Sequence, residues 1–219
     1  ARRRPTRPHL DEARSPPALS LSLRNAVRRK RALTSVRAAV DAARIIGSKI
    51  VVVHFGFFGD IPRGDVLSNI ISSLINLEED IRNSGISIAF ENVATPISMC
   101  SYIIYLLNKY DFQSMGACID IAHANLNEDP PAAVRACADR LLHIHASDNH
   151  GTVDEHLYPM EGTVKWPRVM AALRAVGFDG CFTFEPRKFD SDPADILSEC
   201  RRIYDNLLEL TEEDDIEYP

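Results

Sequence analysis

The sequence lacks the long apolar run that a membrane-spanning helix requires. No stretch approaches the roughly 18 apolar residues of such a span, and the Arg-rich opening has no apolar core of the kind found in secretory signals. Closely spaced cysteines are also lacking: the five cysteines lie far apart and form no CxxC pair. This usage is typical of reduced, buried packing residues. We therefore expect a cytoplasmic protein with no membrane partner.

An excess of positive charge is absent as well. The formal net charge of −6 argues against a general nucleic-acid binder, although a local basic groove is compatible with an acidic whole. A chain of 219 residues with 45% apolar content can bury one sizeable core. We predict a single domain over residues 1–219, with an irregular opening at 1–18 and an acidic tail at 211–219.

Helices and strands are predicted to alternate along the chain. Apolar residues spaced as on one face of a helix run from about Leu21 to Ile46, and Gly47 ends this helix. The β-branched run KIVVVHFG then predicts a buried strand. Further helices are predicted at about 65–83, 97–109, 130–139, 166–176 and 193–210, and further strands at ISIAFEN, GACIDIAH, LLHIHASD and CFTFEPR. This alternation predicts right-handed crossovers and a parallel sheet.

No Gly-rich phosphate loop follows any predicted strand, which weakens the case for an open dinucleotide-binding sheet. The strands end instead in residues that can bind a metal or move a proton: His54, Glu91, Asp120, His145 and Glu185. In a (β/α)8 barrel the carboxyl ends of all strands converge on one mouth, whereas in an open sheet they spread along an edge. We therefore favour an α/β fold of the (β/α)8 TIM-barrel type.

The stretch from Leu141 to Gly162 holds four of the seven histidines, interleaved with carboxylates. It is either a solvated, His-rich loop or one wall of a metal site. Glu91 and Glu185 favour the metal site, because an unpaired charge on a buried strand is costly or shifts its pKa. His54 by itself is more often a hydrogen-bonded core histidine. Imidazole and carboxylate ligands without cysteine suit Zn, Mn, Co, Fe or Mg.

The motifs VVVHFG, IAFEN, CIDIAH, LLHIHASDN and the block from DEHLYPMEG to GFDGCFTFEPR resemble the xylose-isomerase-like TIM barrels. This superfamily joins sugar and sugar-phosphate isomerases and epimerases to endonuclease IV, and the resemblance runs from about residue 19 to 208. It implies a divalent metal (Mn, Zn, Co or Mg), substrate contacts from His123 and His54, and four metal ligands: Glu91, Asp120, His145 and Glu185. The endonuclease-like members hold additional metals, and the positions that match those ligands are His54, His123, Asp154 and His156, with His9 a poor match upstream.

An eight-stranded barrel usually takes about 250 residues. At least the first strand is therefore expected to be missing, which leaves the barrel incomplete at the N-terminus. No convincing strand is expected between Asp148 and Phe178. Exposed sheet edges would need a cover, and a homodimer is one way to provide it. Candidates for apolar walls of the site, or for simple packing, are Phe55, Phe57, Phe58 and Trp166.

The resemblance implies a metal-dependent sugar or sugar-phosphate isomerase or epimerase that transfers a proton between Glu91 and Glu185. One alternative is an endonuclease IV-like phosphodiesterase that acts on abasic DNA, and another is a truncated, catalytically inactive barrel. The loops after Glu91, Asp120 and His145 contain almost no Lys or Arg. This scarcity favours a small sugar or polyol over a nucleic acid as the partner.

Overall fold

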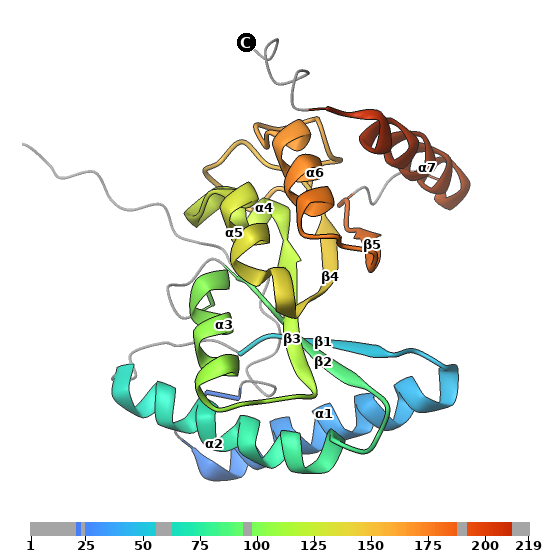
Figure 1. Ribbon diagram of the computed structural model, residues 1–219. Coiled ribbons are helices and arrows are strands. Elements are labelled where there is room, and N and C mark those ends of the chain that lie inside the picture. The colour runs from blue at the N-terminus through green and yellow to red at the C-terminus, as the bar shows by residue number, and fades with distance from the viewer. Residues whose placement is uncertain (1–20, 23–24, 56–62, 94–97, 188–191, 212–219) are drawn as a thin grey trace, which may run out of the picture.

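The computed structural model describes residues 21–22, 25–55, 63–93, 98–187 and 192–211. Within these ranges the chain forms a five-stranded parallel sheet in which each strand pairs with the next one in the sequence. The strands are β1 (Ile50–Val53), β2 (Ser87–Glu91), β3 (Met115–Asp120), β4 (Leu141–Ala146) and β5 (Cys181–Phe184). The α-helices are α1 (Ala26–Ile46), α2 (Arg63–Ile81), α3 (Cys100–Lys109), α4 (Ile121–Asn127), α5 (Pro130–Cys137), α6 (Trp166–Ala175) and α7 (Pro193–Glu209) (Figure 1).

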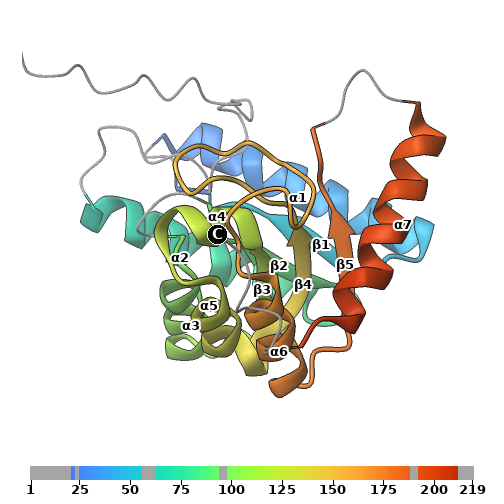
Figure 2. The same cartoon turned by 90° about the horizontal axis from the view of Figure 1, so that it is seen from above.

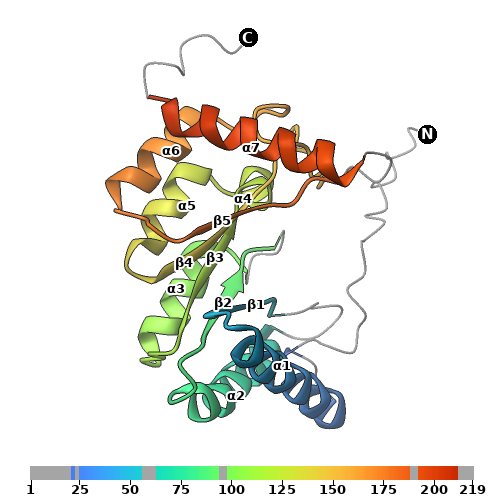
Figure 3. The same cartoon turned by 90° about the vertical axis from the view of Figure 1, so that its right-hand side faces the viewer.

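The helices lie around the outside of the strands, as in a (β/α)8 TIM barrel (Figure 2). Figure 3 shows α1 and α2 beside β1 at one side of the sheet and α6 and α7 at the other. The predicted TIM-barrel fold is therefore confirmed, and the described residues hold five strands of such a barrel. Residues 148–178 form no strand, as predicted, although Asp148 and Leu157 form an isolated antiparallel bridge.

Helix α1 shows how local sequence sets the ends of an element. Its N-cap is Asn25, whose side chain accepts a hydrogen bond from the backbone N–H of Arg28 over 3.0 Å. This cap starts the helix later than the apolar pattern indicates. Gly47 ends it in the left-handed conformation with φ 81°, which costs glycine little. One face of α1 is buried and carries Ala32, Leu33, Val36, Val40 and Ala43.

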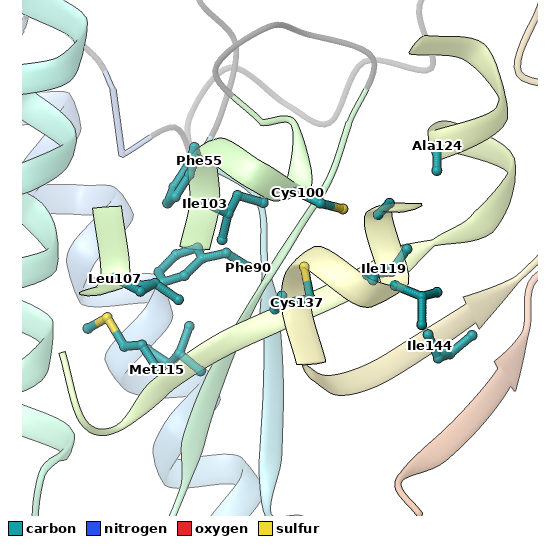
Figure 4. Close-up of a cluster of buried hydrophobic side chains, with 14 of the residues drawn as sticks. Phe55, Phe90, Cys100, Ile103, Leu107, Met115, Ile119, Ala124, Cys137 and Ile144 are labelled. Carbon is teal, nitrogen blue, oxygen red and sulfur yellow. The ribbon is translucent and has the colours of Figure 1, made fainter. Parts of the chain in front are cut away.

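The alternation of side chains along β2 separates the core from the site. Phe90 is fully buried and stacks on Phe55, with 4.7 Å between the ring centroids. Figure 4 shows Phe90 packed beside Ile103 and Leu107 of α3, on the helix-covered face. Because successive side chains of a strand point to opposite faces, Glu91 is directed away from this cluster, toward the inside of the sheet.

Two features of the chain differ from prediction. Residues 121–127 form α4, a short helix that the sequence pattern did not indicate; Asp120 caps it by accepting the backbone N–H of His123 over 3.0 Å. All five cysteines are free, but burial was wrongly predicted for Cys181, which is exposed because β5 is an edge strand. Cys200 is half-buried, whereas Cys100, Cys118 and Cys137 are buried as expected.

Among the helices of the described residues, none combines the length and the apolar character that a bilayer crossing requires.

Candidate active site

Four strand ends bring together one group of potential metal ligands. Glu91 and Asp120 are the last residues of β2 and β3, His145 lies on β4, and Glu185 directly follows β5. One ligand atom from each of these four residues lies within 4.8 Å of the others. The parallel register explains this, because it pairs Asp120 with His145 and sets His145 beside Thr183, two residues before Glu185. We call Glu91, Asp120, His145 and Glu185 the strand-end cluster.

Glu91 contacts three histidines. Its Oε2 lies 2.8 Å from Nε2 of His54, and its Oε1 lies 3.4 Å from Nδ1 of His123 and 3.3 Å from Nδ1 of His145. Burial alone would raise the pKa of Glu91, but the contacts with His123, His145 and His54 lower it far below its usual range. Glu91 is therefore held as a buried carboxylate.

Asp120 is completely buried at the centre of a polar network. Its Oδ1 accepts the backbone N–H of His123 and a hydrogen bond of 3.2 Å from the hydroxyl of Ser147. Its backbone exchanges two hydrogen bonds with the side chain of Asn92, at 2.7 and 3.0 Å. Burial raises the pKa of Asp120. The network fixes the carboxylate in place, which is a function that partners of metal ligands commonly perform.

His145 lies between the two glutamates. Its Nδ1 is 3.3 Å from Oε1 of Glu91 and 3.4 Å from Oε1 of Glu185. Burial favours the neutral ring, but contact with Glu91 and the nearby carboxylates raise the pKa of His145 overall. Burial raises the pKa of Glu185, and the charges of Glu91 and Asp120 reinforce the effect. The two glutamates are thus shifted in opposite directions.

The residues of the strand-end cluster fit a divalent cation. Nδ1 of His145 is buried and makes no hydrogen bond within the described part of the chain. Three carboxylates crowd the same small volume, an arrangement that like-charge repulsion disfavours without a cation. Carboxylates with one imidazole and no thiolate suit Mn, Zn, Co or Mg. The site chemistry agrees with the divalent metal that the sequence predicts.

A second group, formed by His123, Asp154 and His156, adjoins the first. Nε2 of His156 lies 3.1 Å from Oδ2 of Asp154, and Nε2 of His123 lies 3.7 Å from Oδ1 of Asp154. The Nδ1–H of His123 donates to Asn92 O, and that of His156 donates to Glu185 O, so both Nε2 atoms face Asp154. Oδ1 of Asp154 is buried and makes no hydrogen bond to any residue that the structure describes.

Opposite charges in this second group shift one another's pKa values toward the charged forms. Burial opposes ionisation of Asp154, but His123 and His156 lower the pKa of Asp154 well below its usual range. Although burial disfavours a charged ring, Asp154 and Glu91 raise the pKa of His123 to about 11. Contact with Asp154 is also the main cause that raises the pKa of His156. Arg187 adds a further cation, 3.3 Å from Oδ2 of Asp154.

The remaining candidates from the sequence lie at the edge of the site, in the core or outside the described residues. His54 contacts Glu91 and, among the described residues, is not a member of the second group. His9, Phe57 and Phe58 lie outside the described residues. Phe55 and Trp166 are buried core residues, so the packing interpretation is correct for them and they form no wall of the site. The buried indole N–H of Trp166 is satisfied by donating to Oδ2 of Asp148 over 2.8 Å.

The His-rich stretch turns out to be part site and part surface. His145 and His156 join the two groups, whereas His150 forms an exposed pair with Glu155 over 2.9 Å. His143 lies next to Thr183, with 2.8 Å between Nε2 and Oγ1.

Several polar residues that support the site were missed by sequence reasoning. Asn92, Ser147, Asp148 and Asn149 are each at most 1% exposed. Asn149 ties α4, which carries His123, to the following loop, because its Nδ2 donates to Ala122 O over 2.8 Å. The available signal was position alone: Asn92 directly follows Glu91, and the other three residues directly follow one another after the end of β4.

The chain matches the family of xylose isomerase-like TIM barrels over residues 8–206. It belongs to this family. An uncharacterized protein of Methanocaldococcus jannaschii is 30% identical over 171 residues, which cover 72% of this chain and 57% of that protein. D-psicose 3-epimerase of Enterocloster bolteae is 27% identical over 118 residues, which cover 53% of this chain and 37% of that enzyme.

A solved structure resembles most of this chain in its fold. The crystal structure of a D-tagatose 3-epimerase-like protein superposes with a TM-score of 0.77 at 27% identity, covering 90% of this chain and 75% of that one. The chain spans 50% to 59% of the length of the first three curated relatives that it matches.

Proposed function

We propose that this chain is a divalent-metal-dependent sugar or sugar-phosphate epimerase or isomerase that transfers a proton between Glu91 and Glu185. The family, the relative named D-psicose 3-epimerase and the structure of a D-tagatose 3-epimerase-like protein support the reaction class. The observation that carries the proposal is the position of the two glutamates, which reach His145 Nδ1 from different strands at 3.3 and 3.4 Å.

The strand-end cluster would hold the metal. When bound there, a divalent cation would polarise the carbonyl and the adjacent hydroxyl of a ketose and so acidify the C–H of the carbon that carries this hydroxyl. The opposite pKa shifts of Glu91 and Glu185 suit an acid and base pair, because each carboxylate then favours a different protonation state. His123 and His54 border Glu91 and would bind the oxygens of the substrate.

The two glutamates differ in access to solvent, so the proposed reaction should exchange a substrate proton with water. The side chain of Glu185 is 36% exposed and that of Glu91 is 5% exposed. Glu91, held as an ionised carboxylate, can therefore take the proton from substrate, while Glu185, whose raised pKa favours the protonated form, returns a proton that exchanges with water. Epimerisation requires such delivery from the opposite face.

Exchange of substrate C–H with solvent deuterium tests the proposal. The Mn²⁺-loaded protein is incubated in D₂O with ketoses that include D-psicose and D-tagatose, and the products are examined by NMR. Glu91→Gln and Glu185→Gln should each slow exchange by about 10²- to 10⁴-fold, the usual contribution of a general acid or base. Glu155→Gln is the matched control, since Glu155 pairs with His150 at the surface and should keep wild-type exchange. No exchange with any ketose would refute the proposal.

A metal-dependent phosphodiesterase is the second candidate, favoured by the adjacent group of His123, Asp154 and His156. Further metal ions in that group would activate water for attack on phosphate. Nicking of an abasic duplex by the Zn²⁺-loaded protein would support this reaction. Stoichiometric metal binding with neither deuterium exchange nor nicking would indicate an inactive barrel.

A further inference from the structure

Asp148, two residues after β4, is a buried carboxylate that contacts no member of the strand-end cluster in the described structure. It is 0% exposed and accepts four hydrogen bonds. Oδ1 accepts the backbone N–H groups of Asn149, over 2.8 Å, and Val164, over 3.2 Å. Oδ2 accepts the backbone N–H of Met160, over 3.0 Å, and the indole N–H of Trp166, over 2.8 Å. One side chain thus joins the start of the segment 149–163 to its end.

The backbone of Asp148 holds the middle of the same segment. Its N–H donates to Leu157 O over 3.0 Å, and its C=O accepts the N–H of Leu157 over 2.9 Å. Asp154 and His156, two members of the second ligand group, lie between these anchor points. Their positions therefore depend on contacts that Asp148 makes.

The segment needs such anchors because two of its residues have unfavourable backbone conformations. His156 has φ 51° and Met160 has φ 75°, values in the left-handed region that residues with a side chain rarely adopt. Gly162 passes so close to Asp148 that a Cβ atom there would overlap the Asp148 carboxylate and Asn149 O. The surrounding contacts thus fix a strained loop that directs the ring of His156 toward Asp154 and Glu185.

We propose that Asp148 is a positioning residue whose carboxylate fixes the loop 149–163 so that Asp154 and His156 face His123 at the mouth of the site. Being fully buried, Asp148 acts through the loop and not on substrate. The activity part of this proposal rests on the proposed epimerase function, whereas the loop part does not.

Asp148→Asn tests the proposal, because the amide replaces one acceptor oxygen with a donor that must face an N–H group. The matched control is Glu78→Gln, which alters another buried carboxylate that accepts backbone N–H groups, those of Gln113 and Ser114 before β3. Amide hydrogen exchange reports on the loop in each variant, and kcat and KM for ketose C–H exchange report on the site.

Asp148→Asn should speed exchange of the Met160 and Val164 amides at least about tenfold and lower kcat by about 10- to 100-fold, the range typical of residues that orient metal ligands. Glu78→Gln should speed exchange only near Ser114 and keep the wild-type kcat. Unchanged loop exchange in Asp148→Asn, or an equal loss of kcat in both variants, would overturn the proposal.

Two further outcomes are covered by the same design. If Asp148→Asn does not fold, Trp166→Phe removes one of the four donors and should still speed exchange at Met160 and Val164, though less; wild-type exchange there would contradict the proposal. If the wild-type protein turns over no ketose, the proposed function fails, while loop exchange still decides whether Asp148 positions the loop.

Discussion

The hydroxyl of Ser147 donates a hydrogen bond of 3.2 Å to Oδ1 of Asp120, and both side chains are fully buried. The bond orients a carboxylate that also accepts the backbone N–H of His123 and lies 3.7 Å from the Nδ1 of His123. It links β3 to the residue that follows β4, where the two strands carry neighbouring ligands. Support of this kind commonly sets the affinity of a metal site.

Ser147→Ala should therefore weaken binding of Mn²⁺ by about 10- to 100-fold, because Asp120 loses the donor that orients it. Isothermal titration calorimetry measures the affinity. Ser73→Ala is the control. Ser73 lies on the outer helix α2 and is also buried, but it donates to Leu21 O and Asn69 O, away from the site. Equal affinities in Ser147→Ala and wild type would show that this hydrogen bond does not orient a ligand.

Metal affinity should rise with pH across the neutral range. The pKa values of His145 and His156 are raised above the ordinary 6.5 by neighbouring carboxylates, so both rings are largely protonated at or below that pH. A metal binds the neutral ring and must displace these protons. Titrations at pH 6, 7 and 8 in buffers of different ionisation enthalpy, with roughly tenfold tighter binding per pH unit for each proton released, would bear this out. A pH-independent affinity without proton release would contradict it.

Gly162→Ala should displace the loop that carries Asp154 and His156. The added Cβ would overlap the Asp148 carboxylate and the backbone O of Asn149, which cannot both move without breaking hydrogen bonds. We expect faster amide exchange in 149–163 and a destabilisation of about 1–3 kcal/mol, typical of overpacking. Gly64→Ala is the control, because a Cβ there meets nothing within 4 Å in the described structure. A loop unchanged in Gly162→Ala would contradict the close approach.

Phe90→Ala should lower the free energy of unfolding by about 3–5 kcal/mol, because it opens a cavity beside Phe55. Urea unfolding followed by circular dichroism measures the change. Ile45→Ala alters a side chain on α1 that is 85% exposed, and it should stay within about 0.5 kcal/mol of wild type. Similar losses for the two variants would argue against the packing around β2.

The strands and the strand-end cluster were predictable because they follow from local pattern and parallel pairing. A β-branched run such as IVVV predicts a strand, and the carboxyl ends of paired parallel strands meet at one edge. Helix α4 was not predictable in the same way, because its seven residues carry too little periodicity and it depends on the Asp120 cap.

The local sequence pattern could not predict which polar residues are buried. Asp148 and Asn149 look like solvated loop residues in the sequence, yet both are fully buried. Their burial depends on partners up to 27 residues away, such as Ala122 O for Asn149. The hydrogen bond from the Trp166 indole to Asp148 is equally invisible to local pattern, since it forms only once the loop has folded back.

The sequential pairing of the strands bears on how the site is assembled during synthesis. Each strand docks on the one made just before it, so an emerging chain can add one βα unit at a time, with only short loops to close. Glu185 follows the last of these strands. Among the described strands, the strand-end cluster is therefore complete only when β5 has docked, so a growing chain can assemble these four side chains only after the fifth strand has been made.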